Sequence, residues 1–367
     1  MKNKIILLSL VTLLLLTACS HQYDRTDSEK FMITSNVEYV KEFPQEINMS
    51  NPEKVDVNVV GITDFLIVDS VMAFTVKGEK GIMTFAETNN LKVLGKILNI
   101  GNAQDEMSLP PSLSTSCIFY TIKDSLFADL FDGQKGRLLT VNVSKSLAAN
   151  KISITRIQKE GFSNDIFNIA RLDEQTYMVK AISNGDTQQT RKIINLKSGK
   201  ESVTPILEQL NTASVVPGED FNILSTITKT SNDGRIIEMP IGLNYLNIYK
   251  TDGSIAKTIC IGDKLADIDE IMSLDRGDRL YTFSDIRVFK KGFGVVQIDE
   301  TEKQFQSDRT KFPSILFFSF EGKPLAKIDL KRQFTSFDVD FKNNYIYTFD
   351  SQSEEFLRYK IPAELAI

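Results

Sequence analysis

The chain has 367 residues, of which 42 % are hydrophobic and 25 % are charged. This balance is typical of a globular protein and excludes a chain that is disordered throughout. The net charge is −5. Because nucleic-acid binding depends on Lys and Arg side chains that neutralise phosphates, this acidic balance argues against a nucleic-acid partner.

The N-terminal segment predicts export. Lys2 and Lys4 precede an apolar run from Ile5 to Leu16, and Thr17-Ala18-Cys19 follows directly. A run of about twelve apolar residues is too short to cross a bilayer as a helix, and with small residues after it the segment is typical of a signal peptide. We therefore expect residues 1–18 to be a cleaved signal.

Cys19 gives the signal a more specific meaning. Leu16-Thr17-Ala18-Cys19 resembles the lipobox of bacterial lipoproteins, in which the cysteine is acylated and becomes the new N-terminus. The resemblance implies that Cys19 carries lipid and that the protein is attached to the outer membrane, facing the periplasm or the cell surface. An ordinary signal peptide with an incidental cysteine is the alternative.

Residues 19–30 are expected to be a flexible tether, because the stretch from Ser20 to Lys30 is polar and shows no periodicity. Residues 31–367 are expected to form one domain. In this domain short stretches rich in Ile, Val, Phe, Tyr and Thr alternate with turn-forming clusters, and helical periodicity is nearly absent. That pattern predicts an all-β fold.

A strand–turn–strand opening recurs along the domain. Each unit begins with an apolar strand and a tight turn, and the turns start near residues 69, 123, 173, 232, 276 and 342. Four short antiparallel strands repeated at forty to sixty residues are typical of a β-propeller blade. The sequence therefore predicts a six-bladed β-propeller with four-stranded antiparallel blades, and the strand near Phe31–Phe43 is expected to complete the last blade. An irregular pair of β-sandwiches is the alternative.

The lipobox followed by six such units resembles the exported, TolB-like six-bladed propeller lipoproteins of Bacteroidetes. Members of that group often carry a Gly-x-Gly-Pro-x-Glu segment after the first blade. The matching stretch here runs from Gly101 to Met107; it keeps the first glycine and Glu106 and lacks the second glycine and the proline. The resemblance implies a fold and a location, and it implies no reaction.

The search for catalytic groups gives a negative result. The single histidine, His21, lies in the predicted tether, so no Ser-His-Asp or Cys-His arrangement is expected within the domain. Zinc sites built on histidine are excluded for the same reason. Cys117 and Cys260 lie in apolar, strand-like contexts and are expected to be two separately buried thiols, with a disulfide as the alternative. No catalytic residue, metal or cofactor is expected.

Carboxylates remain as candidates. Asp129 with Asp132, and Asp338 with Asp340, could place acids near the central channel, where a suitably spaced pair would serve glycoside cleavage. Aspartates at strand ends that bond backbone amides of turns are the alternative. The acidic stretch 262–270 is interpreted as a solvated connection, with a calcium loop as the alternative.

The stretch 297–313 is longer than a hairpin needs, and long loops on a rigid scaffold often contact ligands. Phe305 and Arg309 are its candidate contact residues, and an exposed excursion without a ligand is the alternative. Taken together, the sequence favours a monomeric, lipid-anchored, non-catalytic binding or scaffold module for a protein or envelope-glycan ligand. A carboxylate-dependent glycan hydrolase or lyase is the second hypothesis, and an accessory subunit of an outer-membrane complex is the third.

Overall fold

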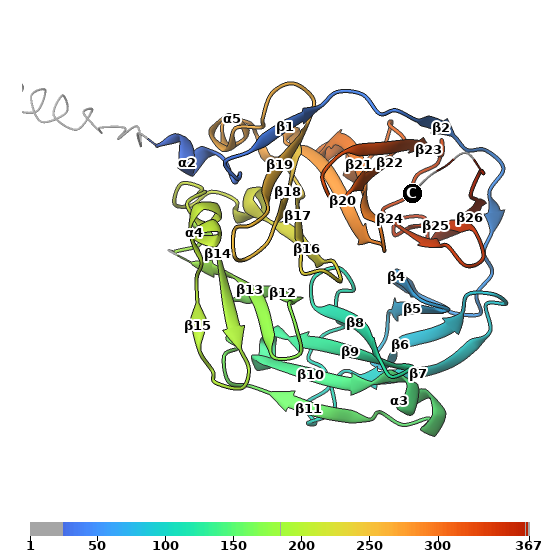
Figure 1. Cartoon of the computed structure of the whole chain (residues 1–367). Coiled ribbons are helices and arrows are strands. Elements are labelled where there is room, and N and C mark those ends of the chain that lie inside the picture. The colour runs from blue at the N-terminus through green and yellow to red at the C-terminus, as the bar shows by residue number, and fades with distance from the viewer. Residues whose placement is uncertain (1–24, 184, 364, 366–367) are drawn as a thin grey trace, which may run out of the picture.

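The computed structural model describes residues 25–183, 185–363 and 365. Its strands form six sheets arranged in a ring, as Figure 1 shows. The first four-stranded sheet contains β4 (Ile62–Val68), β5 (Val71–Val76), β6 (Lys80–Glu87) and β7 (Val93–Asn99). The second contains β8 (Cys117–Ile122), β9 (Ser125–Asp132), β10 (Arg137–Asn142) and β11 (Ile154–Gln158). The third contains β12 (Ile166–Arg171), β13 (Thr176–Ser183), β14 (Gln188–Asn195) and β15 (Glu201–Ser202).

These three sheets are blades 1, 2 and 3 of the ring, and the remaining three blades follow the same plan. Blade 4 contains β16 (Thr226–Thr230), β17 (Ile236–Pro240), β18 (Tyr245–Tyr249) and β19 (Ala256–Ile261). Blade 5 contains β20 (Leu280–Val288), β21 (Gly292–Thr301), β22 (Ser314–Ser319) and β23 (Pro324–Asp329). Blade 6 contains β24 (Ser336–Asp340), β25 (Tyr345–Asp350) and β26 (Glu355–Lys360). The predicted six-bladed β-propeller is therefore confirmed.

Short helices occupy the connections between strands. They are α2 (Asp27–Lys30), α3 (Val143–Ala149), α4 (Pro205–Asn211), α5 (Ile268–Met272) and α6 (Glu302–Gln306), with 3-10 turns η1 (Gly133–Lys135), η2 (Phe221–Leu224) and η3 (Arg276–Asp278). None of the helices in the described part of the chain has the length and apolarity needed to cross a bilayer. Cys19 and the predicted signal lie outside the described residues.

The ring is closed by β3 (Glu53–Lys54), which pairs antiparallel with β26 through Leu357 opposite Lys54 and Arg358 opposite Glu53. The prediction that the strand near Phe31–Phe43 completes the last blade is wrong. That stretch contains β1 (Val37–Val40), which runs parallel beside β19 of blade 4. The closing strand must lie close in sequence to β4, because the same chain has to enter blade 1 directly afterwards.

The N-terminal segment from α2 to β3, which we call the rim segment, follows the rim of three blades before it closes the ring. After β1, the strand β2 (Glu46–Asn48) runs parallel beside β23, so that blades 4 and 5 each have a fifth strand. Figure 1 shows this blue segment passing from α2 across the outer edges toward β26. The rim segment therefore covers the exposed edges of these two sheets, which would otherwise be free to pair with other chains.

The opening of the fifth unit also differs from the prediction. The turn predicted near residue 276 lies in η3, and the residues before it belong partly to α5 instead of a strand. The inner strand of blade 5 is therefore β20, which begins at Leu280. The Asp267 side chain accepts a hydrogen bond from the backbone N–H of Asp269 and caps α5. This capping chemistry is favourable for a helix start and competes with an extended conformation at these residues.

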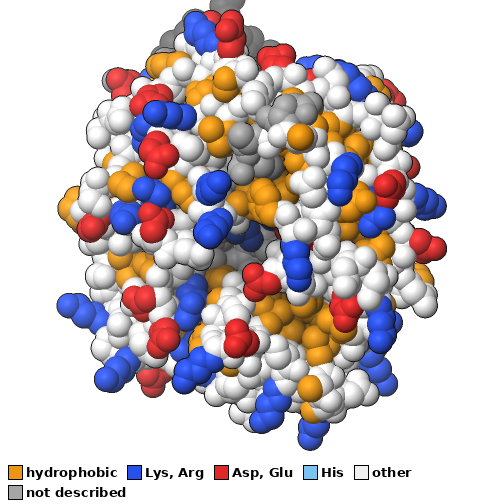
Figure 2. Space-filling view, turned by 45° about the vertical axis from the view of Figure 1, so that its right-hand side comes forward, with side chains coloured by type: hydrophobic (Ala, Val, Ile, Leu, Met, Phe, Trp, Pro, Cys, Tyr) orange, Lys and Arg blue, Asp and Glu red, His pale blue; other side chains and the backbone are white. Residues whose placement is uncertain are grey.

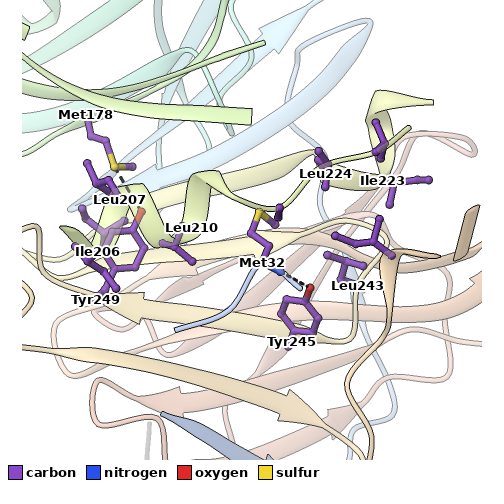
Figure 3. Packing of buried hydrophobic residues seen from close by; sticks show 14 of the residues in the cluster. Met32, Met178, Ile206, Leu207, Leu210, Ile223, Leu224, Leu243, Tyr245 and Tyr249 are labelled. Atoms are coloured by element: carbon purple, nitrogen blue, oxygen red, sulfur yellow. Dashed lines mark hydrogen bonds between the residues drawn. The ribbon is translucent and has the colours of Figure 1, made fainter. Parts of the chain in front are cut away.

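The hydrophobic core lies between neighbouring blades. One cluster joins blades 3 and 4 and includes Met178, Leu210 and Tyr249; Met32 of the rim segment is also fully buried there (Figure 3). The Tyr245 hydroxyl lies 3.1 Å from the backbone N–H of Met32, which donates to it. Cys117 and Cys260 are separate buried free thiols, as the first of the two alternatives predicted.

Candidate functional site

The connections between consecutive blades all lie at one end of the ring. In four-stranded antiparallel blades, the loops after the second and fourth strands lie at the same end, and the loops after the first and third lie at the opposite end. We call the first end the crossover face. It carries α4, α5, α6 and the loop between β23 and β24.

The inner strands β4, β16, β20 and β24 bring together a set of charged side chains that we call the channel cluster. Arg287 of blade 5 donates to the carbonyl oxygen of Phe65 in blade 1 at 2.8 Å, and Lys229 of blade 4 donates to the carbonyl oxygen of Leu113, before blade 2, at 2.9 Å. Each of these side chains therefore reaches past the blade between its own and the one it contacts. The cluster consists of Asp64, Lys229, Asp285, Arg287 and Asp338.

Two of the three carboxylates of the channel cluster, Asp338 and Asp285, join neighbouring inner strands. Asp338 accepts a hydrogen bond from the backbone N–H of Ile67 in the next blade at 2.7 Å. Asp285 accepts one from Phe337 of the next blade at 3.1 Å. These bonds use lone pairs that a catalytic acid or base would need, so Asp338 has a structural role in the ring.

Burial sets the protonation of the channel cluster. Desolvation raises the pKa of Asp285 to about 7 and that of Asp338 to about 6, although the Arg287 guanidinium acts in the opposite direction. Desolvation also lowers the pKa of Lys229 to about 8. Arg287 lies 3.6 Å from carboxylate oxygens of both Asp64 and Asp338, so the charged groups of the cluster are placed to pair with one another.

Asp129 of blade 2 lies on the second strand of its blade and is fully buried. Its carboxylate accepts hydrogen bonds from the hydroxyls of Tyr120 at 3.1 Å, Thr140 at 2.6 Å and Tyr177. Burial, and then the charge of Asp129, raise the pKa of Tyr177 well above its usual range. Asp129 therefore joins blades 2 and 3.

Asp132 and Asp340 also hold loops in place. Asp132 lies 3.5 Å from the Arg137 guanidinium and accepts from the backbone N–H of Ser108 at 3.1 Å. Asp340 accepts from the backbone N–H of Asn343 at 3.0 Å and from its side-chain amide at 2.6 Å. Asp340 therefore ties down the β24–β25 turn, which was the alternative reading of the strand-end aspartates.

The long stretch 297–313 contains the end of β21, the helix α6 and a loop that leads into β22. The loop is fastened to blade 6 by side chains. Arg309 donates to Asp350 at 2.6 Å, the Gln333 amide donates to the carbonyl of Arg309 at 2.7 Å, and the Gln352 amide donates to the carbonyl of Phe305 at 3.0 Å. The excursion is therefore held in one shape on the crossover face.

A groove of about 510 Å³ lies where this loop meets blade 6, and we call it the crossover groove. Phe305 lies beside it, stacked on Tyr281, with the Arg309 guanidinium 5.1 Å from the centre of its ring. Figure 2 shows one face of the molecule hollowed near its middle, with Lys and Arg side chains in and around the hollow. The crossover groove is lined by Arg309, Phe312, Lys331, Arg332, Gln333, Asp350, Gln352, Ser353 and Glu355.

The sequence identified Arg309 as a candidate contact but gave no reason to expect Phe312, Lys331 or Arg332 beside it. Lys331 and Arg332 follow β23, and their position depends on how blade 5 joins blade 6. No local sequence signal links Phe312 to Lys331 and Arg332, because their proximity depends on the packing of the two blades. The inner-strand residues Asp64, Asp285 and Arg287 were missed as well, although Asp338 of the same set was named.

The motif stretch 101–107 folds into a compact loop near blade 2. A Cβ atom on Gly101 would lie 2.0 Å from Glu106 Oε2, so the two residues kept from the motif are in contact. Glu106 accepts from the backbone N–H of Ala103 at 3.0 Å, and Lys135 donates to the carbonyl of Gly101 at 2.7 Å. The motif therefore has a local structural explanation in this chain.

The acidic stretch 262–270 is a connection between blades 4 and 5 that leads into α5. Lys264 pairs with Glu270 at 2.6 Å, and Asp269 pairs with the buried Arg25. Among the described residues, no group of three or more His, Cys, Asp or Glu side chains is placed to hold a metal ion. The stretch thus has charge partners of its own.

No family model matches the chain, and no curated protein matches it. Among solved structures, the chain is similar to a member of the DUF4221 family from Bacteroides vulgatus, with 10 % identity and a TM-score of 0.51 over 84 % of this chain and 97 % of that one. It is also similar to Raptor from Chaetomium thermophilum, with 8 % identity, a TM-score of 0.49 and coverage of 87 % and 30 %. The Pan2 WD40 domain of Neurospora crassa follows, with 9 % identity, a TM-score of 0.41 and coverage of 83 % and 80 %.

At 10 % identity the first of these similarities concerns the fold alone, and the six sheets of the chain define that fold as a β-propeller. A β-propeller offers a rigid scaffold on which loops can carry specific contacts, and one fold can serve many functions. Function therefore has to be argued from the site.

Proposed function

We propose that the protein is an exported, lipid-anchored β-propeller of the bacterial cell envelope that binds a ligand without transforming it. Cys19 is the proposed acylation site, and the crossover groove is the proposed ligand site. The lipobox and the resemblance to TolB-like lipoproteins support the address. The fold and the preformed groove support the binding role.

The proposal that the protein does not transform its ligand rests on one observation about the four aspartates named as candidate site residues. Asp129, Asp132, Asp338 and Asp340 each accept hydrogen bonds that hold strands or turns together. A hydrolase needs one free acid and one free carboxylate that face a common sugar. Engaged carboxylates favour a structural role for these residues and a binding role for the protein.

A carboxylate-dependent glycan hydrolase is the second candidate. The raised pKa of Asp338, about 6, favours it, because a general acid at neutral pH requires such a shift. Against it, Asp338 is buried, bonds two backbone N–H groups and is not among the residues that line the crossover groove.

The test of the cellular address uses a Gram-negative host fed an alkyne-bearing fatty acid. The wild-type chain should incorporate the label, fractionate with membranes and yield a mature N-terminal peptide that begins with acylated Cys19. The Cys19→Ser variant should lose the label. Unlabelled wild-type protein that retains residues 1–18 would overturn the proposed address.

A further inference from the structure

We infer that the crossover groove recognises an oligosaccharide that carries a carboxylate, with Arg309 as the residue that receives the carboxylate. This inference rests on the proposed function, since it names the ligand class of the same site. Three independent features of the groove carry it: an incompletely bonded buried arginine, additional basic groups at the edge, and an exposed aromatic ring.

The first feature is the state of Arg309. Its side chain is only 8 % exposed, and its Nη1 group is bonded to Asp350. Its Nε and Nη2 atoms are buried and have no hydrogen-bond partner among the described residues. A buried donor left without a partner lowers the stability of the folded protein. A guanidinium with two unused N–H positions is suited to the two oxygens of a carboxylate.

Other arginines of the chain do not share this state. Within the described residues, Arg25, Arg137, Arg171, Arg235 and Arg287 each have one buried nitrogen without a hydrogen-bond partner, Nε. Arg25, Arg137, Arg235 and Arg287 use their terminal nitrogens in ion pairs. Arg171 stacks on the ring of Tyr120, and its Nε lies 3.7 Å from Asp129. Among the described residues, Arg309 is therefore distinguished by two buried nitrogens without a hydrogen-bond partner and by its place in the wall of a groove.

The second feature is the charge of the groove. Lys331 and Arg332 line it together with Arg309, and the acidic residues of the lining are Asp350 and Glu355. Asp350 is already paired with Arg309 and bonded to the backbone and hydroxyl of Ser353. These hydrogen bonds hold the pKa of Asp350 below its usual value although burial acts to raise it. The remaining positive charge favours an anion.

The third feature is Phe312, whose side chain is 52 % exposed beside these charges. A flat apolar ring stacks on the C–H face of a sugar, and the carboxylates and amides of the groove accept or donate hydrogen bonds to sugar hydroxyls. A strongly acidic peptide fits less well, because its further carboxylates would lie against Asp350 and Glu355. The combination selects an acidic sugar.

The experiment is a calorimetric titration of the full chain, purified in detergent, with a tetrasaccharide of alternating glucuronate and N-acetylglucosamine. The same tetrasaccharide with its carboxylates reduced to hydroxymethyl groups and a tetraglutamate peptide are the comparison ligands. We expect the acidic sugar to bind at least tenfold more tightly than either, because a charge-assisted contact contributes roughly 1.5–3 kcal/mol.

The variants separate recognition from folding. Arg309→Gln and Lys331→Gln should each weaken binding about tenfold, and Phe312→Ser about threefold or more. Phe341→Ser and Lys342→Gln are matched controls from the opposite face, since Phe341 is 48 % exposed; their affinity should stay within twofold. Arg309→Gln leaves Asp350 without its ion-pair partner and could therefore unfold the protein. For this reason the midpoint of thermal unfolding is measured for every variant. If Arg309→Gln does unfold, Lys331→Gln and Phe312→Ser still test the inference.

Three outcomes would overturn the inference. They are no binding of the acidic sugar by the folded wild type, equal binding of the reduced sugar, and tighter binding of tetraglutamate. None of these results affects acylation of Cys19, so failure of the ligand assignment and failure of the proposed address remain distinguishable.

Discussion

Arg191 of blade 3 and Glu238 of blade 4 form an ion pair across the blade boundary, with both side chains 0 % exposed and 2.9 Å between Nη2 and Oε2. The Tyr249 hydroxyl donates to the same carboxylate at 2.8 Å. Removing one partner of a buried pair leaves an uncompensated charge. This pair therefore fixes how blade 3 packs on blade 4.

We predict that Glu238→Ala lowers the free energy of unfolding by about 3–5 kcal/mol, since the Arg191 charge would remain buried without its carboxylate. Urea denaturation followed by circular dichroism measures the change. The control is Glu354→Ala, which removes the exposed partner of Lys77; its effect should stay below about 1 kcal/mol. Equal effects of the two substitutions would contradict the assigned role of the buried pair.

Lys180 gives a pH dependence of stability. It is fully buried and donates to the carbonyl oxygen of Thr226 at 2.9 Å, and desolvation lowers its pKa to about 7. Between pH 7 and about 10 the unfolded chain therefore binds more protons at this residue than the folded one. The free energy of unfolding should rise with pH over that window, by up to about 1.4 kcal/mol per pH unit from this group.

The comparison variant for this prediction is Lys180→Met. Denaturation curves at several pH values should show a slope between pH 7 and 10 that is smaller in Lys180→Met than in the wild type. Lys342→Met, an exposed substitution, should keep the wild-type slope. A slope that is unchanged in Lys180→Met would show that Lys180 does not titrate in this window.

Gly292 begins β21 at a point where a side chain has no room. A Cβ atom there would lie 2.1 Å from the carbonyl oxygen of Phe318 on the adjacent strand. We predict that Gly292→Ala destabilises the protein by about 1–3 kcal/mol, because backbone of blade 5 would have to move. Gly277→Ala, whose Cβ would lie 3.5 Å from Lys303 Cβ, is the matched control. Thermal unfolding of both variants distinguishes a steric clash from a general effect of alanine.

The rim segment supplies the strand that closes the ring. Val55 and Val57, which follow the end of β3, are buried. Removing residues 1–57 should lower the free energy of unfolding by at least about 3–6 kcal/mol, because burial of each valine contributes roughly 1.5–3 kcal/mol. Removing residues 1–24 should leave the free energy nearly unchanged. If both truncated proteins unfolded at the same urea concentration, β3 would not be the closing strand.

The repeating part of the fold could be predicted from local sequence. Units such as Val68-Asp69-Ser70-Val71 and Ile122-Lys123-Asp124-Ser125 place a turn between two apolar strands, and the structure has a hairpin at each. Local sequence gives little indication of β3, because this strand of two residues depends on its pairing with β26, which lies near the other end of the chain. The prediction of a hairpin turn at 275–278 was wrong, because these residues suit a hairpin and a capped helix equally well.

The candidate site was harder to predict, because its residues are brought together by contacts between blades and not by local sequence. Arg309 could be named because it lies in a long connection, whereas Lys331 and Arg332 reach the groove through the packing of blade 5 against blade 6. Asp285 and Arg287 lie on an inner strand whose neighbours are far apart in sequence. Contacts of this kind depend on ring closure, and residue spacing alone does not encode them.

The most direct test of the central claim is hydrogen–deuterium exchange of the full chain with and without the glucuronate tetrasaccharide. The account predicts slower exchange in 302–313, 331–333 and 350–355, with an unchanged pattern at the opposite face and a saccharide recovered at its original mass. Protection confined to the inner strands together with a shortened saccharide would contradict binding at the crossover groove and favour a hydrolase instead.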